Sequence, residues 1–191
     1  MTLTVLRQRF SHPEWLFEIK YDGFRGLALA HFRHRECELV SRTGHVYKRF
    51  AALNEEIAAS LRVRSAVLDR EIVGVDKQGK PQFCSLMFRH GPARFYASDV
   101  LELNGRDLRL LPAIKRKQVL RRLSSPGNPS LWYVDHFRGD GEELFRLACR
   151  EDLEGIVGKW AQGPYNTQGL SSWIKLKNPQ YSQLAGREEL F

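Results

Sequence analysis

The order of hydrophobic and polar positions along the 191 residues predicts short strands interspersed with a few amphipathic helices. Residues 15–20 alternate between apolar and polar and predict a strand. Residues 26–32 predict its returning antiparallel partner, with residues 20–23 as the turn between them. Residues 38–41 predict a third strand. We therefore expect an antiparallel meander at the start of the fold.

Residues 48–62 predict a helix, because apolar side chains recur every three or four positions along one face. These are Phe50, Leu53, Ile57 and Leu61. Residues 112–123 and 141–151 predict two more helices, the first with a proline that suits a helix start. The outer face of the 112–123 helix is expected to carry Lys115, Arg116, Lys117, Arg121 and Arg122.

Four further strands are predicted in the second half of the pattern. They cover residues 66–75, 95–103, 155–160 and 172–177, with a hairpin loop at 76–81 and a loop at 124–129. Helices and antiparallel strands together predict an α+β fold.

The charge balance adds a class of partner. Lys and Arg number 30 against 22 acidic residues, a net charge of +8, which favours polyanions such as nucleic acid over neutral ligands. A merely basic protein has the same balance. Cys37, Cys84 and Cys149 are widely spaced, which argues against a zinc site and for the reducing cytoplasm. No apolar run suits a signal peptide or a membrane span, so no membrane partner is expected.

Candidate chemistry lies in the stretch that begins at Glu18 and ends at Arg25. Lys20 stands there before an Asp-Gly pair, and a lysine becomes a nucleophile once neighbouring cations or burial remove its proton. Lys175 and Lys177 share one face of a predicted strand near the C-terminus. The pattern predicts attack by Lys20 on a phosphate whose oxygens the two other lysines neutralise. The plainer interpretation is a surface turn and a basic edge strand.

Five segments in a set order carry a resemblance. They are residues 20–25 (KYDGFR), 68–73 (LDREIV), 95–103, 154–159 (EGIVGK) and 173–177 (WIKLK). In this order they resemble the covalent nucleotidyltransferases, above all the adenylation domain of ATP-dependent DNA ligases of the bacterial end-joining type. The resemblance implies an ATP-grasp-like nucleotidyltransferase fold, α+β, with twisted antiparallel sheets flanked by helices.

The resemblance also implies roles for individual residues. Lys20 would take AMP from ATP as a covalent phosphoramidate and release pyrophosphate. Glu18 would contact the adenine amino group, Arg25 the ribose or a phosphate, and Val157 the face of the base. Further nucleotide contacts are implied for Ile19, Glu71, Tyr96, Lys159, Lys175 and Lys177. Glu154 and Glu71 would hold Mg²⁺, which prefers one or two carboxylates together with substrate oxygens.

The implied partner is nicked or broken duplex DNA. Arg42 and Thr43 lie in a turn that resembles the phosphate-gripping loop of ligases, and Lys115 and Arg116 of the basic helix would add contacts. AMP would pass to a DNA 5′-phosphate, and a 3′-hydroxyl would then displace it.

Three departures from the family are visible. Ser98 stands where most such ligases have an adenine-stacking aromatic residue, and Tyr96 on the same strand face is a candidate substitute. Arg70 replaces a glycine. Residues 178–191 are too few for the OB-fold that usually follows, so we expect a single adenylation domain over residues 1–191 with a C-terminal tail over 178–191. The sequence would then be a minimal adenylation domain, a piece of a longer chain, or a monomer that borrows an OB-fold or end-joining proteins in trans.

Three other functions remain open. An RNA ligase shares these motifs, and activity on nicked RNA would reveal it. A capping guanylyltransferase would leave Glu18 facing the carbonyl of guanine rather than an amine. A decayed nucleotidyltransferase would bind nucleic acid without any covalent AMP.

Overall fold

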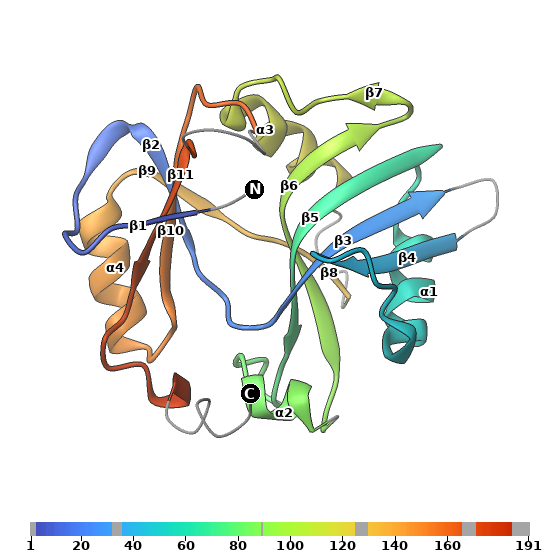
Figure 1. The fold of residues 1–191 in the computed structure, drawn as a ribbon, viewed down its shortest axis with the longest axis horizontal. Helices are drawn as coiled ribbons and strands as arrows, with labels where there is room; N and C mark the ends of the chain where they lie inside the picture. Colours follow the sequence, from blue (N-terminus) through green and yellow to red (C-terminus); the bar gives the residue numbers. More distant parts are fainter. Residues whose placement is uncertain (1–2, 32–35, 89, 125–129, 166–170, 185–191) are drawn as a thin grey trace.

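The protein is built around two twisted β-sheets (Figure 1). The structure, a computed structural model, describes residues 3–31, 36–88, 90–124, 130–165 and 171–184. Sheet A has the order β1 (Thr4–Val5), β11 (Trp173–Lys177), β10 (Gly155–Trp160), β2 (His12–Ile19) and β9 (His136–Gly139). Sheet B has the order β4 (Glu36–Ser41), β3 (Phe24–His31), β5 (Ser65–Gly74), β6 (Ala93–Leu103) and β7 (Arg106–Asp107), and β8 (Leu131–Tyr133) pairs with β6. The expected α+β nucleotidyltransferase architecture of antiparallel sheets and flanking helices is confirmed.

The expected hairpin between residues 15–20 and 26–32 is wrong. β2 pairs with β10 and β9 in sheet A, whereas β3 pairs with β4 and β5 in sheet B. The segment between β2 and β3 is therefore a crossover between the sheets, visible in Figure 1 as the blue loop that runs from one to the other. Local alternation does not reveal this, since the partners of β2 lie more than a hundred residues away along the chain.

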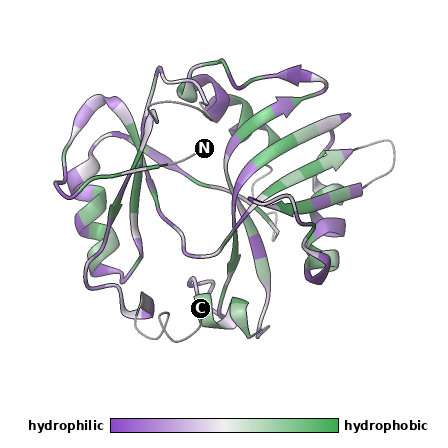
Figure 2. Ribbon diagram, viewed as in Figure 1, coloured by the Kyte–Doolittle hydropathy of each residue, from purple (hydrophilic) through white to green (hydrophobic). Residues whose placement is uncertain are grey.

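Sheet A is covered on one face by α4 (Gly141–Arg150). Alternate residues of three strands, Phe17, Ile156 and Ile174, pack against Leu144 and Ala148 of the helix. Figure 2 shows the matching mixture of hydrophobic and hydrophilic positions along the helix and the strands. The period of two in the strands thus turns the other residues of β2, β10 and β11 towards sheet B.

Sheet B packs against α1 (Ala51–Ser60), which follows a short 3₁₀ turn, η2 (Lys48–Phe50). All four apolar positions predicted for this helix are buried. The observed helix begins later and ends earlier than residues 48–62. Among the described residues, the sequence does not predict β1, β7, β8, β9, the short helix α2 (Phe83–Met87) or the 3₁₀ turn η3 (Ser182–Leu184). Each is too short to show a period.

Helix α3 (Ala113–Leu123) begins directly after Pro112, as expected, but its orientation was predicted wrongly. Arg116 and Lys117 are buried between Ala113 and Leu120 rather than exposed. The spacing of these four positions is i, i+3, i+4 and i+7, which defines one helix face. Arg116 binds both carboxylate oxygens of Asp99, at 2.8 and 2.9 Å, so the buried charge is paired.

No helix among the described residues is both long and apolar enough to cross a lipid bilayer. Residues 32 and 125–129, parts of a predicted strand and a predicted loop, lie outside the described residues. The described part of the expected C-terminal tail, residues 178–184, includes η3 (Ser182–Leu184) and the buried side chain of Tyr181.

Candidate active site

Lys20 lies in the crossover between the two sheets, at the point where the chain leaves β2. Its backbone amide donates a 2.9 Å hydrogen bond to the carbonyl of Gly155. Its Nζ atom lies 2.5 Å from Oε2 of Glu154, with side chains that are 17% and 5% exposed. The crossover thus brings the candidate nucleophile against the candidate metal carboxylate, which the sequence separates by 134 positions.

Gly155, the residue after Glu154, lies so close to the backbone of β11 that a side chain would not fit. Its φ is +141°, and a Cβ atom there would lie 2.0 Å from the carbonyl oxygen of Leu176. Only glycine fits such a close approach of β10 to β11 without moving the backbone.

One row of side chains crosses sheet A on the face turned towards sheet B. In the strand register Lys175 lies opposite Val157, and Val157 lies opposite Glu18. Val157 is fully buried, and burial, together with the nearby ammonium groups of Lys177 and Lys20, lowers the pKa of Lys175. The expected common face of Trp173, Lys175 and Lys177 follows from the same register.

A second row crosses sheet B. Glu71 lies opposite Arg25 on one side and opposite Tyr96 on the other. Burial raises the pKa of the Glu71 carboxyl to about 7, against the opposing effect of cations that include Arg70 and Lys20. Glu71 is thus a carboxyl group within the electrostatic reach of the candidate nucleophile, poised to change its charge near neutral pH.

Arg25 is held by two partners that sequence reasoning missed. Its Nη2 lies 3.1 Å from Asp69, and Tyr165 donates a hydrogen bond of 2.9 Å to the same carboxylate. Asp69 is fully buried, whereas the Arg25 side chain is 25% exposed. This arrangement fixes the guanidinium at the sheet surface, where a planar fork suits ribose or phosphate oxygens.

Glu18 does not stand free to meet a ligand. Its carboxylate lies 2.9 Å from the ammonium of Lys117 and 2.9 Å from that of Lys159, and all three side chains are buried. Burial by itself would raise the pKa of Glu18, but the two lysines and Arg70 outweigh it, so the pKa is lowered. The predicted period of helix α3 was the signal that could have revealed Lys117.

The expected phosphate contact of Lys159 is wrong for this arrangement. The ammonium is fully buried, donates 2.8 Å to the carbonyl of Ser98 and lies 4.1 Å from the centre of the Trp173 ring. Side chains of β10 alternate between its two faces, so Lys159 and Val157 lie on the same face, and both are fully buried. Lys159 therefore neutralises the buried carboxylate of Glu18 and is not exposed to meet a phosphate.

Tyr96 does not replace the missing aromatic residue at position 98. It is 4% exposed and packs against Tyr21 and Trp132, with ring centres 4.3 and 5.7 Å apart, which leaves no open ring face for adenine. Ser98 itself is buried and lies at a register shift between β5 and β6. The extra residue of this β-bulge explains why simple alternation misplaced the two positions.

The remaining predicted residues lie apart from this centre. The Ile19 side chain packs with the α4 cluster, on the opposite face of β2 from Glu18, so only its backbone remains for a ligand.

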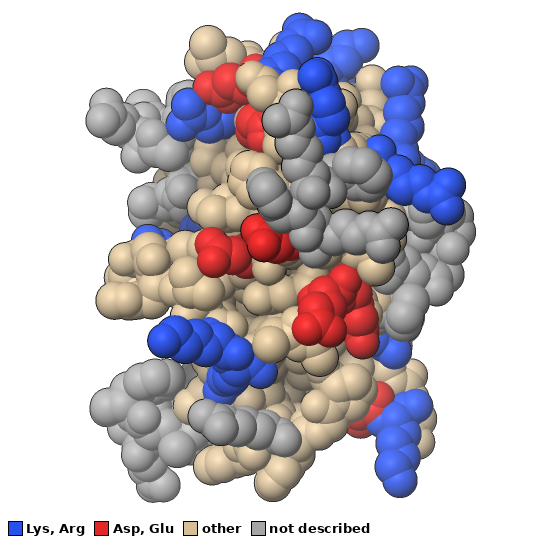
Figure 3. Space-filling model, turned by 90° about the vertical axis from the view of Figure 1, so that its right-hand side faces the viewer, with Lys and Arg blue, Asp and Glu red and all other residues tan. Residues whose placement is uncertain are grey.

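The residues predicted to contact nucleic acid differ in exposure. Arg42 and Thr43 are exposed in the turn after β4, and Lys115 is exposed on α3. Arg116 is buried, so its expected contact with nucleic acid is wrong. In Figure 3, most basic side chains of the face shown lie at its upper end, others lie in its lower part, and acidic ones cross its middle.

Glu154 and Glu71 fit the requirements of Mg²⁺. Among the described residues no cluster of three or more His, Cys, Asp or Glu side chains forms a closed metal cage. Magnesium, however, is usually held by one or two carboxylates while substrate phosphates complete its shell. The buried Glu154 carboxylate beside Lys20 has the right donor chemistry, and Glu71 is a second carboxyl group whose pKa responds to the charge of Lys20.

Comparison with known proteins identifies the family. Residues 3–177 match the family model described as ATP dependent DNA ligase domain. The chain belongs to this family. It is 34% identical over 176 residues to the multifunctional non-homologous end joining protein LigD of Mycolicibacterium smegmatis, covering 88% of this chain and 22% of that protein. The ligase-domain resemblance inferred from the five motifs is confirmed.

Solved structures agree on the fold of this ligase domain. A mycobacterial DNA ligase D complexed with ATP and MES superimposes with a TM-score of 0.73 at 29% identity, over 92% of this chain and 60% of that one. The ligase domain of LigD from M. tuberculosis gives 0.73 at 28% identity, over 92% and 58%. The SPbeta prophage-derived DNA ligase-like protein LigB of Bacillus subtilis is 27% identical over 96% of this chain and 68% of its own length. The chain thus spans about a fifth of LigD and over half of the ligase structures.

Proposed function

We propose that this chain is the adenylation domain of an ATP-dependent DNA ligase and that Lys20 is its nucleophile. The observation that carries the proposal is the pairing of Lys20 with Glu154 in the crossover, beside the row that includes Lys175. A buried carboxylate 2.5 Å from an ammonium can accept its proton, which leaves the amine that nucleophilic attack requires.

The reaction follows from these positions. The Lys20 nitrogen attacks the α-phosphorus of ATP, a phosphorus–nitrogen bond forms, the bond to the β-phosphate oxygen breaks, and pyrophosphate leaves. Lys175, Lys177 and Arg25 neutralise the phosphate oxygens. Mg²⁺, held by Glu154 and Glu71, would supply further charge neutralisation at the phosphates. Phosphoryl transfer depends mainly on such positioning and electrostatics.

The later steps belong to the same proposal. AMP passes from Lys20 to the 5′-phosphate of nicked or broken duplex DNA, and a 3′-hydroxyl displaces it. Arg42, Thr43 and Lys115 contact the DNA backbone, since each is exposed. Residues 1–191 act as one adenylation domain of a cytoplasmic, monomeric ligase, which works with an OB-fold domain, in the same chain or in trans, or with end-joining proteins.

The test is labelling with α-³²P-ATP and Mg²⁺ followed by a denaturing gel. We expect an acid-labile adduct on the wild type and on Lys77→Ala, an exposed lysine of the 76–81 loop, but none on Lys20→Ala. Mass spectrometry of the purified protein detects AMP that is already attached. A wild type with neither label nor bound AMP would contradict the proposal and favour a nucleic-acid-binding module.

The nature of the polynucleotide needs its own comparison. The adenylated protein is mixed with nicked duplex DNA or nicked RNA of the same sequence, and sealed strands are separated on a gel. We expect sealing, or at least transfer of AMP to the 5′-phosphate, on DNA. Transfer to RNA alone would identify an RNA ligase, and labelling by GTP rather than ATP a guanylyltransferase.

A further inference from the structure

The chain does not leave the site after β11. Residues 178–183, which we call the strap, bind the segment before β10, the crossover that carries Lys20, and the start of α2 with the loop before it. In Figure 1 the strap includes the short red helix at the end of the molecule where α2 also lies. None of the residues predicted for the site from sequence belongs to it.

The first strap contact fixes the backbone at Glu154. Asn178 donates from its backbone amide to the carbonyl of Glu154, at 2.9 Å, and from Nδ2 to the carbonyl of Leu153, at 3.1 Å. Asn178 is 3% exposed. Ser182 adds a backbone hydrogen bond of 2.9 Å to the carboxylate of Asp152. Three successive residues that lead into β10 are therefore bound by the strap.

The second contact reaches the other partner of the ion pair. The Tyr181 hydroxyl donates a 3.1 Å hydrogen bond to Oδ2 of Asp22, two residues after Lys20. Both side chains are only 5% exposed. A hydrogen bond to a buried carboxylate is among the stronger kinds, so it holds the crossover in place.

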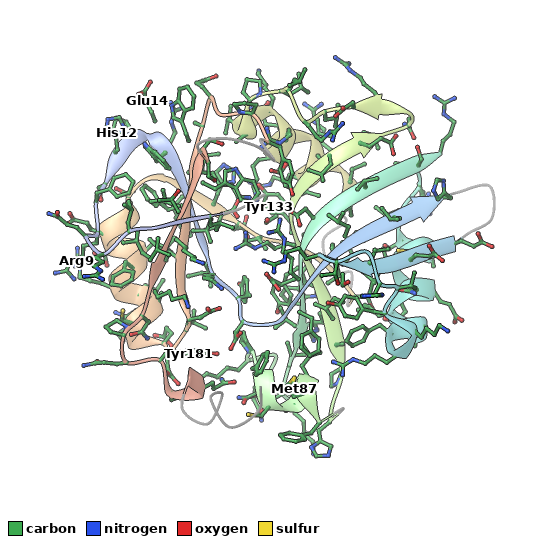
Figure 4. All side chains as sticks on the ribbon, in the orientation of Figure 1. Arg9, His12, Glu14, Met87, Tyr133 and Tyr181 are labelled. Carbon is green, nitrogen blue, oxygen red and sulfur yellow. The ribbon has the colours of Figure 1, made fainter. Side chains whose placement is uncertain are left out.

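The third contact ties the strap to the start of α2 and to the loop before it. The side-chain oxygen of Gln183 accepts a 2.8 Å hydrogen bond from the amide of Phe83, and its nitrogen donates to the carbonyl of Pro81 at 3.3 Å. Figure 4 shows Tyr181 and Met87 of α2 at the same end of the molecule. The strap thus runs from the end of β11 to α2 and, on the way, binds the segments that carry Glu154 and Lys20.

We propose that Tyr181 and Asn178 are positioning residues that hold Lys20 and Glu154 in register for adenylyl transfer. This inference rests on the proposed function. Each residue binds within two positions of one member of the pair, and neither contacts the pair's charged atoms directly. A misplacement of about 1 Å in such a constellation can cost on the order of 100-fold in rate.

The first experiment measures single-turnover adenylation by the full chain. Bound AMP is removed beforehand with pyrophosphate. Tyr181→Phe keeps the ring and loses the hydroxyl, and Asn178→Asp keeps the Asn178 Oδ1 that accepts from Gln180 but loses the donor to Leu153. Ser60→Ala, which removes a hydroxyl bonded to the Ile57 carbonyl in α1, is the matched control.

We expect both strap variants to slow the step at saturating ATP by about tenfold or more, with half-saturation by ATP within about twofold of wild type. Ser60→Ala should keep the wild-type rate. Strap variants as fast as Ser60→Ala, or variants that change only the ATP concentration for half-saturation, would overturn the inference.

A second experiment does not depend on adenylation. Trace acetylation with acetic anhydride, read by peptide mass spectrometry, compares the reactivity of Lys20 with that of exposed Lys77 in the same sample. Tyr181→Phe should raise this ratio at least twofold, because the ammonium separates from Glu154 and becomes accessible. An unchanged ratio would overturn the inference. If the wild type never takes AMP but Tyr181→Phe still raises the reactivity ratio twofold, the positioning role of Tyr181 stands and only the proposed function is contradicted.

Discussion

The amide of Lys20 and the carbonyl of Gly155 form a 2.9 Å hydrogen bond that joins the end of β2 to the start of β10. This bond sets the Lys20 backbone beside the residue that follows Glu154, and the two side chains then meet at 2.5 Å. The contact between Lys20 and Glu154 is therefore a product of strand register in sheet A, where β2 and β10 are neighbours.

Gly155→Ala should disrupt this register. A methyl group would lie 2.0 Å from the Leu176 carbonyl, at a φ of +141° that L-residues rarely adopt. We expect a loss of several kcal/mol in the free energy of unfolding, on the order of other severe core clashes. Chemical denaturation measures it. Gly26→Ala is the control, because its nearest contact would be an ordinary 3.5 Å; equal stabilities for the two variants would contradict the geometry.

Glu154→Gln should slow adenylation while the protein still folds. The amide keeps the size of the side chain but no longer accepts the proton of Lys20 or offers a carboxylate to Mg²⁺. Adenylation should slow by about 100-fold or more, since general-base contributions are of this order. The rate of AMP labelling is measured beside that of Glu151→Gln, an exposed residue of the same loop. Similar rates for the two variants would remove Glu154 from the mechanism.

Glu18→Gln should cost stability. The substitution leaves the buried ammonium groups of Lys117 and Lys159 without their shared anion, and breaking a buried ion pair costs about 3–5 kcal/mol. Because the folded-state pKa of Glu18 lies below its usual 4.5, its contribution is present above that pH and is lost as the pH falls. Denaturation at pH 7 and at acidic pH checks both statements, with exposed Glu36→Gln as control. Unchanged stability at pH 7 would show that the carboxylate is not needed there.

Glu71 should make both stability and activity depend on pH near neutrality. Its pKa of about 7 lies above the usual 4.5, so the folded state binds the extra proton between these values. Stability therefore falls as the pH rises from 4.5 to 7, and Glu71→Gln should flatten this slope. Adenylation should rise over the same range if the carboxylate is the active form. A wild-type activity profile that is flat from pH 6 to 8 would contradict this role.

Truncation of Lys115 should weaken DNA binding, whereas truncation of its neighbour Arg116 should lower the stability of the fold. Lys115 is exposed, so Lys115→Ala should weaken binding to nicked DNA about twofold to threefold, lower the salt slope by about one and leave the melting temperature unchanged. Arg116→Ala should destabilise the fold by about 3–5 kcal/mol, because Asp99 would remain buried and unpaired. Binding isotherms at several salt concentrations and thermal unfolding separate the two effects. A stable Arg116→Ala with weaker DNA binding would reverse the assignment.

The sequence by itself determined the main helices, most long strands and the chemical identity of the site. Helical and strand periods are local, so Leu53 and Ile57 of α1 and the common face of Lys175 and Lys177 were predictable. The five ordered motifs were enough to identify the ligase family, and they made Lys20 the predicted nucleophile. These conclusions depend on residue types and short spacings, which need no knowledge of partners.

Only the tertiary structure decided which strands pair and which charges meet. The partners of β2 lie far along the chain, so the crossover at Lys20 was taken for a hairpin. A β-bulge at Ser98 shifted the predicted adenine face, and burial converted Lys117 and Lys159 from surface or phosphate-binding groups into partners of Glu18. Strand register, bulges and buried ion pairs are set by contacts between distant segments, and their energies depend on burial that no local pattern records.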